Sequence, residues 1–225
     1  MSHELRTPLN AIIGFSTVLR NGTYGVLSSV QAEFVANILK AGRHLLRLVD
    51  DILTFSEAEA GRLALQREDV EAGPLVREAV AEVDALARQK AIVLAVDTGD
   101  RVARVSADAA MLKQMVGELL TNALKFTPEG GTVTITVRVD GDVLRITVRD
   151  TGIGIKPESQ DRVFGVFEQV DSSYARAQQG AGLGLALTRR LAVLHGGRIV
   201  LESSGVAGEG STFTIEIPAL TGERA

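Results

Sequence analysis

GAGLGLAL, residues 180–187, lies directly before an apolar helical pattern that continues to His195. Three glycines alternate with other residues in this stretch: Gly180, Gly182 and Gly184. Glycine has no Cβ atom, so the backbone here can approach an anion, and the start of a helix presents unpaired N–H groups to it. The stretch therefore predicts phosphate binding. Taken alone, a glycine-rich flexible loop explains it equally well, because the spacing matches neither the dinucleotide fingerprint nor the P-loop.

A second glycine motif, DTGIG at residues 150–154, follows a predicted strand. Asp150 continues the alternation of three apolar residues, Leu144, Ile146 and Val148. We therefore expect its carboxylate to face the interior, where it needs a hydrogen-bond donor. Gly152 and Gly154 would let a flat ring lie against the backbone, so an adenine amino group is the predicted partner of Asp150. The alternative is a carboxylate that caps its own turn.

A third group of polar residues lies on a predicted helix upstream of both motifs. Glu118, Asn122 and Lys125 are spaced by four and three residues, which places them on one helix face. An amide oxygen suits Mg²⁺, which keeps most of its water and phosphate ligands, and a lysine can neutralise phosphate charge. A polar helix face is usually only solvated surface, so the prediction depends on the three motifs occurring together.

The patterns around these motifs predict an α+β fold in two domains, residues 1–62 and 63–225. Residues 1–62 form two helices separated by the turn formers of residues 21–25. The boundary follows Gly61, which ends the second helix, and precedes a charged stretch that reaches Pro74. Beyond it, helices at 75–89, 107–126 and 183–195 are interspersed with strands near 92–96, 105, 133–139, 144–148, 198–202 and 212–217. Helices on one face of a mixed sheet are expected.

The second helix of the N-terminal domain carries two apolar stripes, and one partner helix can cover only one of them. One stripe consists of Phe34, Ile38, Ala41, Leu45, Leu48, Ile52 and Phe55. Its neighbour consists of Val35, Leu39, Gly42, Leu46, Val49 and Leu53. Two copies of the hairpin would cover both stripes in a four-helix bundle, so we predict a homodimer. Packing onto the rest of the same chain is the alternative.

Composition excludes several other functions. The 24 basic and 28 acidic residues give a net charge of −4, which predicts no binding to nucleic acid. The absence of cysteine removes thiolate catalysis and cysteine zinc sites. No apolar run approaches the roughly 18 residues of a membrane span, and the N-terminus lacks the apolar core of a signal peptide. We expect a cytoplasmic chain without direct membrane contact.

The ordered motifs resemble those of sensor histidine kinases. ELLTNALKFT (118–127) resembles the N box, DTGIGI (150–155) the first glycine box, VFGVFEQV (163–170) the phenylalanine box and GAGLGLAL the second glycine box of their ATP-binding domain. SHELRTPLNAI (2–12) resembles their phosphoacceptor box. The resemblance covers nearly the whole chain and implies a Bergerat-type ATP-binding sandwich joined to a dimerising phosphoacceptor hairpin.

The resemblance implies a reaction as well as a fold. His3 would accept the γ-phosphate of Mg²⁺-ATP, and Glu4 would help to take its proton. The phosphoryl group would then pass to an aspartate on the receiver domain of a response regulator. Thr7 matches the position that orients water when the regulator is dephosphorylated. A neutral imidazole beside a carboxylate is a competent nucleophile at cellular pH, so the chemistry agrees with these roles.

The resemblance also assigns the nucleotide site. Asn122 would bind Mg²⁺, Glu118 would organise its water or the attacking group, and Lys125 would contact phosphate. The remaining expected nucleotide-binding residues are Asp150, Gly152, Gly154, Gly180, Gly182, Leu183, Gly184 and Thr212, of which Thr212 would support adenine.

No helical turn precedes His3 in this chain, so we expect either a fragment of a longer sensor or a chain with impaired activity.

Two alternatives to an active kinase follow from the same motifs. A pseudokinase, a dimeric module that binds ATP without transferring phosphate, is the first alternative, although no motif residue is missing. An ATPase clamp is the second, and HELRTP on a dimerising hairpin argues against it.

Overall fold

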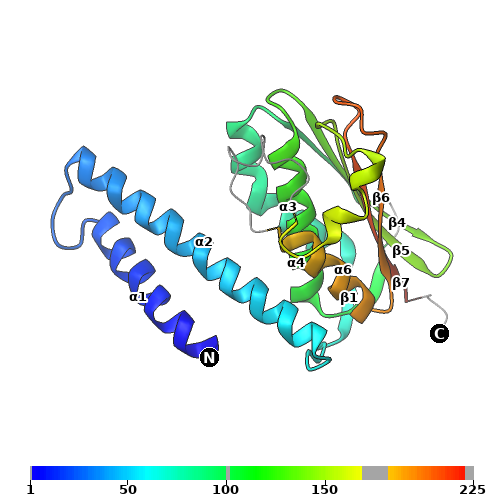
Figure 1. Ribbon diagram of the computed structural model, residues 1–225, viewed down its shortest axis with the longest axis horizontal. Coiled ribbons are helices and arrows are strands. Elements are labelled where there is room, and N and C mark those ends of the chain that lie inside the picture. The colour runs from blue at the N-terminus through cyan, green and yellow to red at the C-terminus, as the bar shows by residue number, and fades with distance from the viewer. Residues whose placement is uncertain (1, 100–101, 169–181, 221–225) are drawn as a thin grey trace. The chain divides into compact units, whose positions relative to one another are not determined.

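The computed structural model describes residues 2–99, 102–168 and 182–220, except for the side chains of Ser2 and His3. The chain divides into two compact units, Met1–Ala60 and Gly61–Ala225. The first is a hairpin of α1 (Ser2–Arg20) and α2 (Ser29–Glu59), and the second combines a sheet with helices (Figure 1). No helix within the described ranges is both long and apolar enough to cross a membrane.

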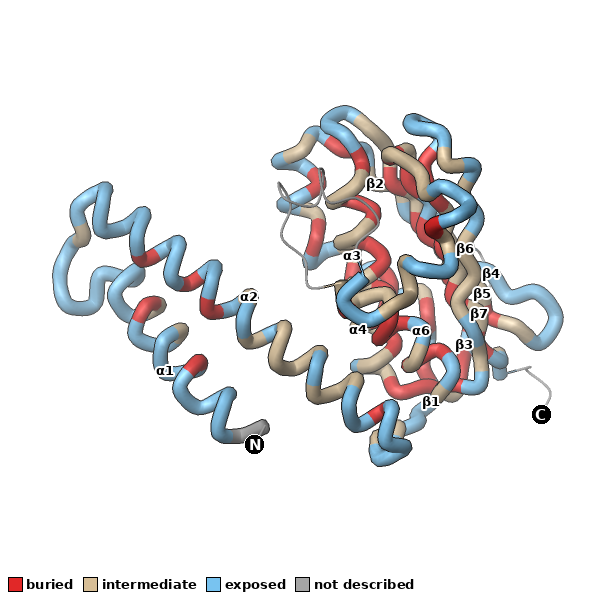
Figure 2. The backbone as a smooth tube through the Cα atoms, in the orientation of Figure 1, coloured by how far each residue is buried: buried red, intermediate tan, exposed pale blue. Residues whose placement is uncertain are grey.

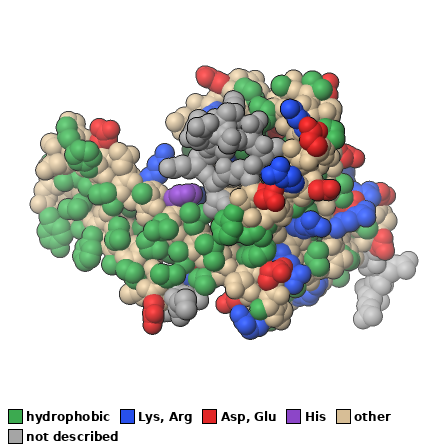
Figure 3. Space-filling model, in the orientation of Figure 1, with side chains coloured by type: hydrophobic (Ala, Val, Ile, Leu, Met, Phe, Trp, Pro, Cys, Tyr) green, Lys and Arg blue, Asp and Glu red, His purple; other side chains and the backbone are tan. Residues whose placement is uncertain are grey.

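The two stripes of α2 have different environments (Figure 2). One stripe packs against α1: Val35 and Leu39 are buried, and Gly42 admits Ile13, whose Cγ1 would lie 3.2 Å from a Cβ atom there. The other stripe is largely exposed, at 62% for Phe34, and α1 exposes Phe15 at 73%. Figure 3 shows hydrophobic side chains gathered over the hairpin. Packing within the hairpin therefore leaves a second apolar surface uncovered.

The second unit is built on a mixed sheet with helices on one face, as the sequence predicts. Its strands are β2 (Val93–Asp97), β4 (Thr132–Asp140), β5 (Val143–Asp150), β6 (Arg198–Glu202) and β7 (Thr212–Pro218). They are ordered β2-β4-β5-β7-β6, and among these neighbours only β2 and β4 run parallel. The covering helices are α3 (Ala72–Gln89), α4 (Ala109–Phe126) and α6 (Gly184–Leu194) (Figure 1).

The core lies between the sheet and α4, which packs against both α3 and α6. Along β5 and β7 every second residue is buried, and these inward residues meet the apolar face of α4. Leu112, Met115 and Leu120 of α4 are fully buried. Because α4 carries Glu118, Asn122 and Lys125 on its remaining face, burial of the apolar face fixes how those polar side chains are presented.

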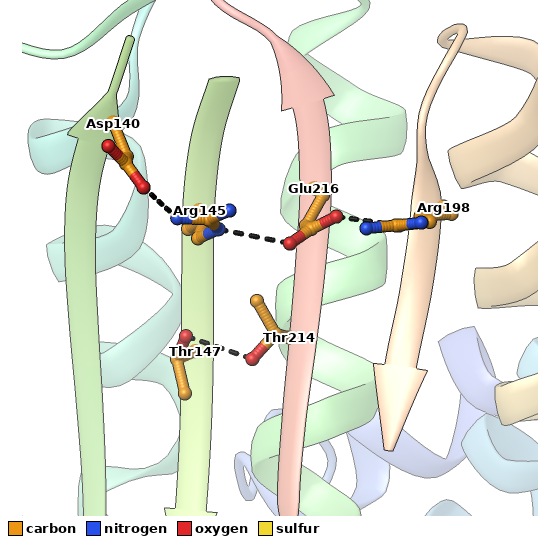
Figure 4. A network of polar contacts seen from close by, with 6 residues as sticks. All are labelled: Asp140, Arg145, Thr147, Arg198, Thr214 and Glu216. Carbon is orange, nitrogen blue, oxygen red and sulfur yellow. Dashed lines mark hydrogen bonds and ion pairs between the residues drawn. The ribbon is translucent and has the colours of Figure 1, made fainter. Parts of the chain in front are cut away.

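The opposite face of the sheet is polar (Figure 4). Arg145 of β5 forms ion pairs with Asp140 and, at 3.0 Å, with Glu216 of β7. Glu216 also pairs with Arg198 of β6 at 2.7 Å, and hydrogen bonds from these two arginines lower the pKa of Glu216. Such solvent-exposed pairs contribute little to stability, so this network marks the outer face of the sheet and not a second core.

A second, two-stranded sheet of β1 (Glu68–Glu71) and β3 (Arg104–Ala107) was only half predicted. The sequence predicts the short strand near residue 105, whereas β1 falls in the charged stretch after the domain boundary, where no strand is expected. Only Val70 is buried in β1, so its sequence contains no alternation that could indicate a strand. Two 3₁₀ turns, Pro157–Ser159 and Arg162–Phe164, complete the described elements.

Lys90 stabilises the C-terminal end of α4. Its ammonium group donates to the carbonyl oxygens of Leu124 (2.5 Å), Thr127 (2.8 Å) and Lys125 (3.3 Å), and burial lowers the pKa of Lys90. We expect Lys90→Met to lower the free energy of unfolding by about 1–3 kcal/mol, because these carbonyls lose a charged donor. Lys113→Met, which removes only exposed ion pairs to Glu78 and Glu82, is the control and should cost much less. Equal losses in chemical denaturation would contradict this role for Lys90.

Candidate functional site

Asp150 lies at the end of β5 with its side chain on the buried side of the sheet. It is 5% exposed, and its Oδ1 accepts a hydrogen bond from the Gly152 N–H at 2.7 Å. Burial raises the pKa of Asp150, while backbone hydrogen bonds from Gly152 and Ser211 act in the opposite direction. The alternation that predicted an interior carboxylate is therefore present in the structure. A carboxylate in such a place provides an acceptor for one specific donor.

Close backbone contacts surround Asp150. A Cβ atom on Gly152 would lie 2.5 Å from the carbonyl oxygen of Phe126, the last residue of α4. Gly154 has φ +70° and would place a Cβ atom 3.0 Å from the carbonyl oxygen of Val206. The first glycine motif therefore packs against the end of α4 and against the loop before β7. Side chains at these two positions would displace backbone, so both glycines are structurally required.

The predicted polar face of α4 lies beside the same region. Glu118, Asn122 and Lys125 are all half-buried, as expected for residues on one edge of a packed helix. The Lys125 ammonium group lies 4.8 Å from the centre of the Phe126 ring, and burial lowers the pKa of Lys125. A partly desolvated cation at this position gains from an anionic partner such as phosphate.

The second glycine motif meets α4 at Glu118. A Cβ atom on Gly184 would lie 2.0 Å from the Glu118 Oε2, so only glycine lets the start of α6 approach this carboxylate so closely. Leu183, the residue before α6, is buried and forms no side-chain cap. The first N–H groups of α6 therefore have no side-chain cap, which an anion site at a helix start requires, and they lie next to the face of α4 that also carries Lys125.

Gly182 joins this motif to the phenylalanine-containing segment. It has φ +69°, and its carbonyl oxygen accepts a hydrogen bond from the Phe167 N–H at 3.0 Å. Phe164 packs edge-to-face on Phe213 with ring centres 6.3 Å apart, whereas Phe167 is 64% exposed. Gly180, also expected to bind phosphate, lies outside the described residues.

Among the expected nucleotide-site residues that the structure describes, Thr212 is not brought to this group. It pairs with Arg149 across β5 and β7, on the sheet face opposite to Asp150. Ser211 takes that place instead: it is 6% exposed, and its carbonyl oxygen accepts the Asp150 N–H at 2.9 Å. Because side chains alternate along a strand, a shift of one residue reverses the face. Counting back from the buried Phe213 would have indicated Ser211.

The proposed phosphoacceptor segment forms the first turns of α1. The backbone of His3 is helical, and its side chain lies outside the described part of the structure. Glu4 and Thr7 are exposed on the same helix. Arg6 belongs to none of the predicted functional residues, yet its Nε lies 2.6 Å from the Asp50 Oδ1, so this ion pair joins α1 to α2 one turn from His3.

The donor set indicates how a cation would be held. The described residues contain no group of three or more His, Asp or Glu side chains that could bind a metal ion. A single amide oxygen, that of Asn122, beside a lysine fits Mg²⁺ only where phosphate oxygens and water fill the remaining positions. Such a site suits an ion that enters together with a nucleotide.

Two known families match separate parts of the chain. The family described as histidine kinase-, DNA gyrase B-, and HSP90-like ATPase matches residues 107–221. The His Kinase A (phospho-acceptor) domain matches residues 1–61. These ranges contain the glycine motifs and the HELRTP segment, respectively.

Relatives and solved structures are similar over the same length. The circadian input-output histidine kinase CikA of Synechococcus elongatus is 44% identical over 223 residues, covering 98% of this chain and 29% of CikA. Histidine protein kinase DivJ of Caulobacter vibrioides is 44% identical over 220 residues, covering 98% of this chain and 36% of DivJ. The chain therefore spans about a third of the length of these curated relatives.

Two solved structures agree with this likeness. Full-length ShkA in complex with AMPPNP has a TM-score of 0.79 at 34% identity and covers 98% of this chain and 45% of its own. The histidine kinase AdeS of Acinetobacter baumannii has a TM-score of 0.68 at 25% identity and covers 97% of this chain and 98% of its own. The chain thus belongs to the histidine kinase-, DNA gyrase B-, and HSP90-like ATPase family, as a sensor histidine kinase core whose ATPase domain follows a His Kinase A phospho-acceptor domain.

Proposed function

We propose that this chain is an autophosphorylating protein-histidine kinase that transfers the γ-phosphate of ATP to His3. The observation that carries the proposal is the position of α4 between the two glycine motifs. Its end contacts Gly152 beside Asp150, and its middle contacts Gly184 at the start of α6. One helix thereby links an acceptor suited to adenine with N–H groups and a lysine suited to phosphates.

Each part of the site has a separate role in this proposal. Asp150 accepts a hydrogen bond from the adenine amino group, and Gly152 and Gly154 admit the ring. Gly180, Gly182, Leu183 and Gly184 present backbone to the phosphates, and Lys125 neutralises their charge. Asn122 would hold Mg²⁺, which supplies further charge neutralisation on the phosphate oxygens when bound. Phosphoryl transfer depends mainly on such positioning and charge stabilisation.

The proposed reaction balances with the residues of the phosphoacceptor segment. A neutral ring nitrogen of His3 attacks the γ-phosphorus, and the bond to the oxygen that bridges the β- and γ-phosphates breaks, which releases ADP. Glu4 stabilises the positive charge that develops on the ring and takes its proton. Glu118 organises the attacking group from the nucleotide side.

We also propose a homodimer through α1 and α2. The exposed stripe of α2 contains Phe34, Ile38, Leu45 and Ile52, all at least 44% exposed, and α1 adds Leu5, Ile12, Phe15 and Leu19. An apolar surface of this length is unusual on a monomer. A second copy of the hairpin would cover it in a four-helix bundle.

The downstream partner follows from the same proposal. Phosphohistidine would pass its phosphoryl group to an aspartate on the receiver domain of a response regulator, and Thr7 would orient water in the reverse, dephosphorylating reaction. Residues 1–62 would serve dimerisation and phosphoacceptance, and residues 63–225 would serve ATP binding. The use of ATP and of such a partner places the reaction in the cytoplasm.

The test is autophosphorylation with ATP labelled at the γ-phosphate. The unaltered chain is expected to acquire an acid-labile, alkali-stable label, and His3→Gln is expected to lose it completely because it removes the nucleophile. His44→Gln is the matched control: His44 lies on α2 away from both apolar stripes, and the label should persist. Label that survives His3→Gln would refute His3 as acceptor, and tight ATP binding without any label would favour the pseudokinase.

A further inference from the structure

His195 is buried between α4 and α6, and both of its ring nitrogens form hydrogen bonds. It is 1% exposed and follows the last residue of α6. Its Nδ1 lies 2.8 Å from the carbonyl oxygen of Leu191, one turn earlier in the same helix. Its Nε2 lies 3.1 Å from the backbone nitrogen of Asp108, the N-cap residue of α4. The ring therefore connects the end of one site-bearing helix to the start of the other.

The partners determine the protonation state of this ring. A carbonyl oxygen can only accept and a backbone N–H can only donate, so Nδ1 carries the proton and Nε2 is the acceptor. Burial lowers the pKa of His195, and the charged groups facing it are Arg67, which lowers it further, and Asp108, which raises it. A neutral imidazole is thus the form present at neutral pH.

The helices that His195 joins run antiparallel and touch again where the start of α6 meets the middle of α4. Asp108 at the start of α4 meets His195 at the end of α6, while Glu118 in the middle of α4 meets Gly184 at the start of α6. With about 1.5 Å of rise per residue, these two contacts are about 15 Å apart along α4. A slip at the His195 contact would therefore shift the start of α6 relative to Glu118.

The segment that enters the second unit is bonded to the same place. The Gln66 N–H donates to the Asp108 Oδ2 at 2.9 Å. The Arg67 guanidinium donates to the carbonyl oxygens of Ser106 and Leu194, both at 3.0 Å. Thus Gln66 and Arg67, just after the start of the second unit, join the start of α4 to the end of α6, as His195 also does.

We propose that His195 is a positioning residue for the nucleotide site, which sets the register between α4 and α6 through its acceptor bond from the Asp108 N–H. The inference rests on the proposed function, which identifies these residues as a nucleotide site. Residues 66 and 67 reinforce the same junction, so a displacement of this entering segment reaches both helices that carry the nucleotide-binding residues.

Two substitutions separate this role from simple packing. In His195→Gln the amide reaches the position of Nε2 and can accept from the Asp108 N–H. In His195→Asn the shorter amide reaches only the position of Nδ1, so it keeps the bond to Leu191 within its own helix and leaves the Asp108 N–H unpaired. Both variants replace the ring with a smaller polar group. A role in packing alone also makes Asn the worse substitution, because it is the smaller of the two, so the measurement that separates the roles is amide exchange at the distant start of α6.

The full chain and both variants are compared by AMPPNP binding in the presence of Mg²⁺ and by amide hydrogen exchange without nucleotide. We expect the Kd to rise about tenfold or more in His195→Asn and to stay within about threefold in His195→Gln, with thermal unfolding measured for each. Exchange at residues 184–188 should accelerate in the Asn variant only. Equal effects of the two variants, or faster exchange confined to the neighbours of Asp108, would overturn the proposal. If the unaltered chain binds no nucleotide, the proposed function fails, and the exchange comparison alone decides the role of His195.

Discussion

Gly210→Ala is expected to destabilise the second unit severely. Gly210 has φ +70°, and a Cβ atom there would lie 1.9 Å from the carbonyl oxygen of Asp150 and 2.8 Å from its Oδ1. A left-handed conformation costs an L-residue about 1–2 kcal/mol, and forced overpacking adds about 1–3 kcal/mol. We therefore expect a loss of about 2–5 kcal/mol in the free energy of unfolding. ATP binding should be lost as well, because the added Cβ atom would displace Asp150, the proposed partner of adenine.

Gly208→Ala separates the two contributions. Gly208 also has a positive φ, +93°, but no heavy atom lies within 4 Å of its added Cβ atom. This variant should show only the conformational cost and keep its affinity for ATP. Calorimetric unfolding of the two variants and the unaltered chain measures the difference. Equal destabilisation by both substitutions would show that the contact with Asp150 is not tight.

The parts of this protein that could be predicted from sequence are those whose cause is local. Alternation along residues 144–150 predicts the buried Asp150, because a strand places every second side chain on one face. The two stripes of the second helix are likewise visible as periodicity. The structure divides them into one that packs against α1 and one that is exposed. The polar face of α4 follows from spacings of three and four residues.

The parts that could not be predicted depend on contacts between distant segments. Nothing in the sequence indicates that the carboxylate of Glu118, 66 positions earlier, occupies the space that a side chain at position 184 would need. The sequence gives His195 no function beyond its place at the end of a helix, since its partner Asp108 is 87 residues away. Thr212 was assigned from the resemblance, and the register of β7 against β5 shows that Ser211 is the residue beside Asp150.

Asp150→Asn is expected to abolish ATP binding without damaging the fold. The Asn Oδ1 can still accept from the Gly152 N–H, which lies 2.7 Å from the Asp150 Oδ1. The second carboxylate oxygen becomes an amide NH₂, which donates where the adenine amino group also donates. Two opposed donors in a buried site should lower ATP affinity at least about 100-fold, which is about 2.7 kcal/mol.

Stability should change in the opposite direction to binding. Because burial raises the pKa of Asp150, the ionised carboxylate is less favourable in the folded chain than in the unfolded one. The stability that this group contributes is therefore fully present only below its ordinary pKa and is lost as the pH rises through the raised value. At neutral pH the neutral amide removes this penalty, so the variant should unfold at the same temperature as the unaltered chain or at a higher one.

Asp140→Asn makes the same chemical change on the outer face of the sheet, where the exposed Asp140 pairs with Arg145, and it should leave ATP affinity unaltered. Calorimetric titration of the three chains with ATP and with GTP completes the test. Guanine carries an oxygen where adenine carries the amino group, so an amide donor at position 150 can pair with it, and the preference for ATP over GTP should fall. If Asp150→Asn retained ATP affinity within about threefold, the adenine amino group would not be the partner of this carboxylate. The proposed orientation, with adenine at Asp150 and the phosphates at the start of α6, would then have to be reversed.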